Sequence, residues 1–123
     1  MIDKTYTYAI VGASNDASKY GYVVMKDLLG AGFKVVPINL HEEMILGKKV
    51  YPTLSDYPNK IDVVVFLVPP RVVVSVLEEV RKLKISKVWM QPGSESPEAI
   101  DYCSFNAISC VHHACIMVER RKK

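Results

Sequence analysis

The chain has 123 residues, and we expect one domain over residues 1–123 rather than a catalytic domain joined to a separate regulatory one. Half of the residues are hydrophobic and 24% are charged, which is typical of a folded globular protein and excludes a disordered or fibrous chain. The formal net charge is +3, and the basic residues 120–123 account for it, so we expect no nucleic-acid partner. We interpret this basic tail as a solvated end.

The cysteines and the apolar segments indicate a protein of a reducing compartment. Three cysteines, Cys103, Cys110 and Cys115, are an odd number, and the sequence shows no secretory signal pattern. We therefore expect a cytoplasmic protein without a disulfide framework. The longest apolar run, residues 63–70, is far shorter than the roughly 20 residues of a bilayer-spanning helix, so we expect no membrane partner.

Strands and helices are predicted to alternate along the chain. A strand over residues 6–11 ends at Gly12, and apolar residues at helical spacing predict a helix over residues 20–31. Further strands are predicted over residues 34–38, 50–51, 61–68, 87–91 and 108–111. Further helices are predicted from Thr53 onward, over residues 70–84 and over residues 97–105, with residues 39–47 as a connection.

The fourth predicted strand, residues 61–68, marks the centre of the sheet. It is nearly continuous Val, Phe and Leu, which is the pattern of a strand covered by helices on both faces. Pro70 suits the first position of the helix that follows, and Ser96 suits the N-cap of the next helix.

This alternation predicts right-handed βαβ units and therefore an α/β fold, a Rossmann-like doubly wound parallel sheet between two layers of helices. We predict the order 3-2-1-4-5-6, counting the predicted strands along the chain. A ligand of such a sheet binds beyond the carboxyl ends of the strands, where the order reverses. The predicted crevice therefore has residues 12–15 on one side and Val68 and Pro69 on the other.

The loop after the first strand has features of a phosphate site. Gly12 permits a tight turn, and Ser14 and Asn15 place short polar side chains near the start of the first helix. The later glycines of the dinucleotide fingerprint are missing, and no Asp or Glu ends the second strand at Asn39, so NAD is disfavoured. An ordinary strand-to-helix turn is the alternative interpretation.

Six segments of the chain, in order, are similar to those of a known family. The sequence resembles the small stand-alone CoA-binding domain proteins, which are similar to the N-terminal CoA-binding domain of the succinyl-CoA synthetase α subunit. The resemblance is carried by Gly12-Ala13-Ser14 with Tyr20-Gly21, Val36-Pro37-Ile38-Asn39, residues 46–52, Val68-Pro69-Pro70, residues 89–93 and Cys115 with Glu119. Ligase activity is not implied, because the histidine phosphorylated in the synthetase belongs to another domain.

The resemblance implies coenzyme A as the cofactor and assigns a part of it to each segment. Gly12, Ala13, Ser14 and Asn15 would cradle the phosphates, Pro37 and Asn39 would border the nucleotide, Val68 and Pro69 would contact adenine or pantetheine, and Gln91, Pro92 and Gly93 would lie toward the pantetheine end. By their positions in the predicted sheet, Tyr20 would flank the phosphate loop and Cys115 would face the cofactor thiol. A semi-buried small hydrophobic residue is the alternative interpretation of Cys115.

His112, His113 and Cys115 are potential metal ligands, but neighbouring side chains of a strand point to opposite faces. We therefore predict no metal site. The sequence supplies no Asp or Asn to orient a Cys115–His113 pair, so we predict no catalytic residue.

The leading hypothesis is a cytoplasmic carrier, sensor or regulatory module that binds coenzyme A or an acyl-CoA without chemistry of its own. Two alternatives stay open. One is an enzyme that uses a nucleotide or acyl-CoA in the same crevice with Cys115 and His113, and the other is a ligand-free interaction module. Apolar surface on the outer helices also leaves a homodimer open.

Overall fold

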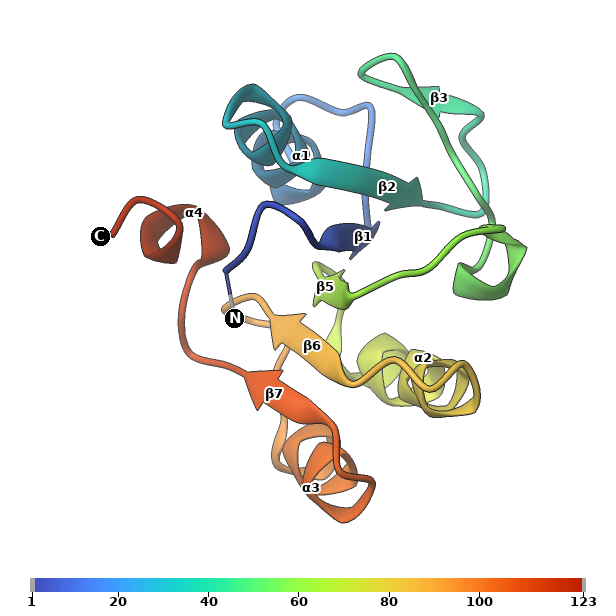
Figure 1. Ribbon diagram of the computed structural model, residues 1–123, viewed down its shortest axis with the longest axis vertical. Helices are drawn as coiled ribbons and strands as arrows, with labels where there is room; N and C mark the ends of the chain where they lie inside the picture. The colour runs from blue at the N-terminus through green and yellow to red at the C-terminus, as the bar shows by residue number, and fades with distance from the viewer. Residues whose placement is uncertain (1, 123) are drawn as a thin grey trace.

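A five-stranded parallel sheet forms the centre of the molecule in a computed structural model that describes residues 2–122 (Figure 1). The strands lie in the order β2-β1-β5-β6-β7. Their bounds are Thr7–Val11 for β1, Lys34–Ile38 for β2, Val63–Phe66 for β5, Lys87–Met90 for β6 and Ser109–Val111 for β7. The predicted α/β class and parallel sheet are confirmed.

The central strand is β5, as its apolar sequence predicts. All four of its residues are fully buried, and it pairs with β1 on one side and β6 on the other. In the parallel pairing of β1 and β5, Tyr8 lies beside Val63 and Val11 lies beside Phe66. The carboxyl ends of the two strands are therefore level with each other. The loops that follow these two strands are therefore neighbours.

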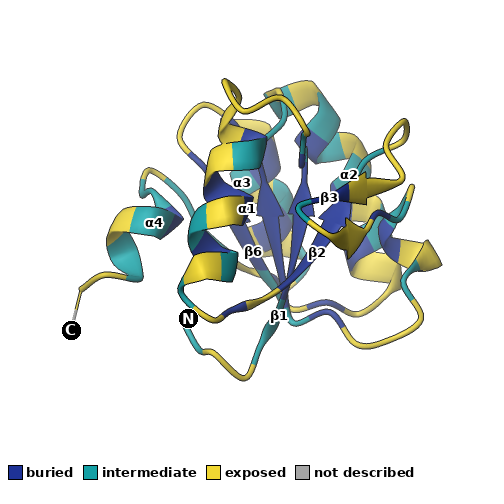
Figure 2. Cartoon of the chain, turned by 90° about the horizontal axis from the view of Figure 1, so that it is seen from above, coloured by how far each residue is buried: buried dark blue, intermediate teal, exposed yellow. Residues whose placement is uncertain are grey.

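Helices cover both faces of the sheet, so the core has two halves (Figures 1 and 2). Helices α1 (Tyr20–Gly30) and α4 (Ile116–Glu119) pack on one face. The 3-10 helix η1 (Leu54–Asp56) and helices α2 (Pro70–Lys82) and α3 (Pro97–Phe105) pack on the other. Within residues 2–122, no helix has the length and apolar character needed to cross a membrane.

The predicted strand over residues 50–51 is reduced to a single bridge, which corrects the expected six-stranded order. Tyr51 lies beside Ile38 at the edge next to β2, where its N–H donates to the Pro37 carbonyl at 3.1 Å. The pairing goes no further because the next N–H on this side of the segment, that of Thr53, donates to the carboxylate of Asp56 at 3.1 Å, where η1 begins.

The predicted connection over residues 39–47 contains a small hairpin. Strand β3 (Met44–Ile45) pairs with β4 (Lys48–Lys49) in antiparallel fashion. Leu46 and Gly47 between them have φ angles of 49° and 77°, as the two central residues of a type I′ turn require. The hairpin lies over the end of β2, and Ile45 is fully buried in the α1 half of the core.

The basic tail is attached to the domain at Arg120, so its interpretation as a solvated end is wrong for that residue. Arg120 donates to both carboxylate oxygens of Asp27 on α1, at 2.7 and 2.8 Å, and Arg121 adds a third bond at 3.0 Å. The short helix α4 turns these side chains toward α1. Lys123, also part of the predicted tail, lies outside the described residues.

We expect Asp27→Asn to lower the free energy of unfolding at pH 7 by about 1.5 kcal/mol, because it removes a half-buried, charge-assisted pair. The hydrogen bonds from Arg120 hold the pKa of Asp27 below its ordinary value in the folded state. The pair therefore stabilises the fold above the ordinary pKa, and this stabilisation is lost as the pH falls through the lowered one.

Urea denaturation of both proteins from pH 7 to pH 2 measures this difference, which should shrink below about pH 4. Asp101→Asn, at an exposed position of α3, is the matched control and should change little. A difference between wild type and Asp27→Asn that does not depend on pH would contradict the assignment.

Candidate functional site

The candidate site lies beyond the carboxyl ends of β1, β2 and β5. The chain leaves β1 toward α1 on one face of the sheet, and it leaves β5 toward α2 on the opposite face. Two neighbouring parallel strands whose connections diverge in this way create a crevice at the edge of the sheet. The crevice therefore lies between the loop after Val11 and the loop after Phe66.

Gly12 allows these two loops to touch. Its φ is +102°, and a Cβ at this position would overlap the carbonyl oxygen of Leu67 and come within 3.0 Å of a Val68 methyl group. The Leu67 N–H donates to the Val11 carbonyl at 2.9 Å, so the two backbones are joined here. Only glycine satisfies both the angle and the contact.

Gly21 brings the first turn of α1 against the same loop. A Cβ on Gly21 would overlap the carbonyl oxygen of Gly12 and lie 3.3 Å from the Cα of Ala13. The free amide groups and the positive dipole end of an 11-residue helix therefore lie beside the loop. This is an arrangement that binds phosphate groups. Gly21 allows α1 to pack closely against the end of β1. In the dinucleotide fingerprint, a later glycine that this sequence lacks has that role.

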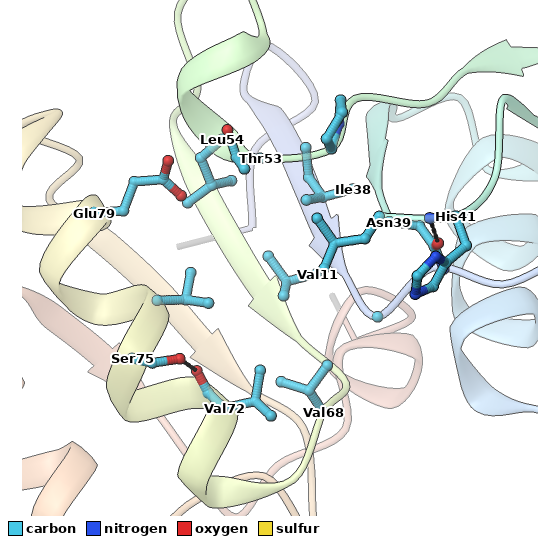
Figure 3. Close-up of a pocket in the computed structure, with 14 residues that line it drawn as sticks. Val11, Ile38, Asn39, His41, Thr53, Leu54, Val68, Val72, Ser75 and Glu79 are labelled. Carbon is cyan, nitrogen blue, oxygen red and sulfur yellow. Dashed lines mark hydrogen bonds between the residues drawn. The ribbon is translucent and has the colours of Figure 1, made fainter.

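The first pocket of the crevice has a volume of about 380 Å³ and lies between β2, η1 and α2 (Figure 3). Its floor is apolar and includes Val11, Ile38 and Leu54, while its two ends are polar. The full lining is Val11, Gly12, Ile38, Asn39, Leu40, His41, Pro52, Thr53, Leu54, Val68, Val72, Ser75, Val76 and Glu79.

A second pocket of about 410 Å³ adjoins the first at Val68, which lines both. It extends toward the end of β6 and is lined by Tyr20, Leu67, Val68, Pro69, Pro70, Pro92, Gly93 and Ser94. The Ser94 hydroxyl donates to the Val68 carbonyl at 2.7 Å and thereby ties its two walls together. The two pockets make one groove across the carboxyl edge of the sheet.

Seven of the thirteen predicted cofactor residues line this groove. Gly12 and Asn39 line the first pocket, Val68 lines both, and Tyr20, Pro69, Pro92 and Gly93 line the second. The other six line neither pocket: Ala13, Ser14, Asn15, Pro37, Gln91 and Cys115.

The asparagines of the site hold loops together. Asn39 donates to the Ala13 carbonyl at 2.8 Å and accepts from the His41 N–H at 2.7 Å, which joins the loops after β1 and β2. Asn15 donates to Glu42 and to the Met44 carbonyl, so its amide faces the β3–β4 hairpin. The Ser14 hydroxyl accepts from the Asp16 N–H at 3.0 Å.

Gln91 and Cys115 lie at the attachment of α4. The Gln91 side chain accepts from the Ile116 N–H at 2.8 Å and donates to the Cys115 sulfur at 3.4 Å. Gln91 is buried, and its partners bring the start of α4 to the end of β6. Pro37 is also buried, within β2 and opposite Ile10, on the α1 side of the sheet.

The two neighbouring histidines face each other, which corrects the expectation of opposite orientations. Their Nδ1 atoms are 2.7 Å apart. The reason is that β7 ends at Val111 and that His113 has a φ of 57°, so neither residue continues the strand. Among residues 2–122, no three His, Cys, Asp or Glu side chains are grouped to hold a metal ion. All three cysteines are free thiols.

The sequence analysis does not predict that residues of α2 form one wall of the first pocket. Val72, Ser75, Val76 and Glu79 recur at helical spacing and form one stripe beside the core stripe of Val73, Leu77 and Val80. The sequence gives no signal for this wall, since any amphipathic helix has mixed positions at the boundary between its apolar and polar faces.

The sheet and the crevice define a Rossmann-like α/β domain with a ligand groove at its topological switch point. The profile of the family described as CoA binding domain matches residues 6–121. The chain therefore belongs to the CoA-binding domain family, as the resemblance of its motifs implies.

Known relatives agree with this membership. The α subunit of an ADP-forming acetate–CoA ligase (II) from Pyrococcus furiosus is 40% identical over 72 residues, which are 58% of this chain and 16% of that subunit. A ligase of the same name from Methanocaldococcus jannaschii is 43% identical over 74 residues, 60% of this chain and 10% of that protein. The chain thus spans a small part of these enzymes.

A solved structure of similar size covers almost the whole chain. It is a conserved hypothetical protein from Pyrococcus furiosus, with a TM-score of 0.89 and 39% sequence identity. The match covers 93% of this chain and 98% of that one.

We expect Gly21→Ala to destabilise the domain by about 2 kcal/mol, because the added methyl group would overlap the Gly12 carbonyl in a packed interior. Gly30→Ala in the same helix is the matched control, since a Cβ there meets nothing within 4 Å. It should be neutral or stabilising by up to about 1 kcal/mol. Urea denaturation distinguishes the two, and equal effects would contradict the packing argument.

Proposed function

We propose that this protein binds coenzyme A or an acyl-CoA along the groove and acts as a carrier, sensor or regulatory module without chemistry of its own. The observation that carries the proposal is the pair of pockets that adjoin at Val68, in a chain of the CoA-binding domain family.

The two pockets suit the two halves of this ligand. The apolar floor of the first, with Val11, Ile38 and Leu54, suits an adenine ring. The loop at Gly12 and the first turn of α1 suit the pyrophosphate. The second pocket, with Pro69, Pro70 and Pro92, offers a mostly neutral path for the pantetheine arm.

The absence of chemistry in the proposal rests on the position of Cys115 and His113. Neither residue lines either pocket. Cys115 accepts a hydrogen bond from Gln91, and His113 faces His112. The ligase relatives match this chain over a small part of their length, so their acyl-activating reaction is not transferred to it.

We expect coenzyme A and acetyl-CoA to raise the melting temperature, while NAD and NADP do not. A ligand at 100 times its dissociation constant stabilises the folded state by roughly 2.7 kcal/mol. A thermal-shift series with these four compounds and ATP is the measurement. Stabilisation by NAD alone, or by none of the compounds, would contradict the proposal.

We expect Val72→Trp to weaken the binding of coenzyme A by at least about tenfold, because the indole would occupy the first pocket, which Val72 lines. Isothermal titration calorimetry measures the affinity, and urea denaturation verifies that the variant folds. Glu78→Trp places the same side chain at an exposed position of α2 that does not line this pocket, and it should bind normally. Unchanged affinity in a folded Val72→Trp protein would exclude this pocket as the binding site.

A further inference from the structure

We propose that Glu79 makes the first pocket selective for a base that carries an exocyclic amino group, as adenine does, over a base with a carbonyl oxygen at the same position. This inference rests on the proposed function, because it concerns the nucleotide end of the same groove.

The lining of the first pocket includes Gly12, which directly follows Val11 at the end of β1, and Glu79, on the third turn of α2. Figure 3 shows Val11 and Glu79 on different sides of the pocket. Val68 lies at the Gly12 end, Val11 and Ile38 lie along the floor, and Glu79 with Thr53 stands at the far end. A nucleotide with its phosphates at Gly12 would therefore direct its base toward Glu79. The carboxylate repels phosphate groups and so favours this orientation over the reverse.

Hydrogen bonds fix the carboxylate of Glu79. Its Oε2 accepts from the hydroxyl of Ser55 at 2.6 Å and from the Ser55 N–H at 3.2 Å. Within residues 2–122, no group donates to the other oxygen, Oε1, which leaves it available to a ligand.

The hydroxyl groups in the lining of this pocket are committed as donors. The Ser75 hydroxyl donates to the Val72 carbonyl at 2.8 Å, and the Thr53 hydroxyl donates to Asp56 at 2.8 Å. Their remaining capacity is to accept hydrogen bonds, as is that of a carboxylate. Glu79, Ser75 and Thr53 therefore form a set of acceptors, which a ligand satisfies only by presenting a donor.

At the exocyclic position adenine presents an amino group with two hydrogens, whereas hypoxanthine presents a carbonyl oxygen there and carries its donor, the N1–H, one ring position away. Adenine would donate to Glu79 through a charge-assisted hydrogen bond. The oxygen of hypoxanthine would face an acceptor, so both groups would lose their contact with water and gain nothing in return. The apolar floor would contact both rings equally, so it would contribute the same binding free energy to each base.

The test compares the affinity of coenzyme A with that of its hypoxanthine analogue, in which the adenine amino group is replaced by oxygen. We expect wild type to bind coenzyme A about tenfold more tightly than the analogue in calorimetry. Glu79→Gln should reduce this preference to about twofold or less, because a carboxamide can rotate to present either a donor or an acceptor.

Two further variants separate recognition from structural support. Ser55→Ala removes the hydroxyl that holds Glu79 but keeps the carboxylate, so the preference should persist. Glu78→Gln changes the neighbouring acid, which pairs with Lys82 and does not line this pocket, and should also leave the preference intact.

Equal affinity of wild type for the two ligands would overturn the inference and leave the proposed function standing. A preference that survives Glu79→Gln, or one that Ser55→Ala abolishes as fully as Glu79→Gln does, would also overturn it. Failure of wild type to bind coenzyme A at all would instead reject the proposed function, and this inference with it.

Discussion

The groove depends on the direct contact of three backbone segments around Gly12. The end of β1 lies against the end of β5 on one side and against the first turn of α1 on the other, and neither contact leaves room for a Cβ at Gly12 or Gly21. Because no side chain stands between them, the amide groups at the start of α1 lie at the edge of the crevice. The two pockets open on either side of this contact.

The loops around the contact are held together by polar side chains. Asn39 joins the loops after β1 and β2, Ser94 joins the ends of β5 and β6, and Gln91 holds the start of α4. Each bond links segments that are distant in the sequence, so the bonds hold the loops at the edge of the sheet in fixed positions relative to one another. Such preorganisation reduces the loss of conformational freedom on binding.

Much of the fold could be predicted from the sequence because the relevant signals are local. The continuous apolar run at Val63–Phe66 identified the central strand, and Ser96 with Pro97 identified the start of α3. The edge of the sheet was harder to predict, since the N–H of Thr53 bonds to Asp56 and the pairing of Tyr51 with β2 ends after one bridge. The attachment of Arg120 to Asp27 could not be foreseen, because the two residues are 93 positions apart and become neighbours only through the packing of α4 on α1.

The sequence by itself determined the class of fold, the position of the crevice and membership of the CoA-binding domain family. The reason is that hydrophobic periodicity, turn residues and short motifs are local features that can be read without the tertiary structure. Only the tertiary structure decided which of the motif residues line the groove. In the folded chain, Asn15 and Gln91 form hydrogen bonds that hold neighbouring segments together. The packing of α2 also brings Glu79 into the pocket lining with Thr53 and Ile38. The physical reason is that a pocket is a property of side chains from several elements, and their directions depend on how those elements pack together.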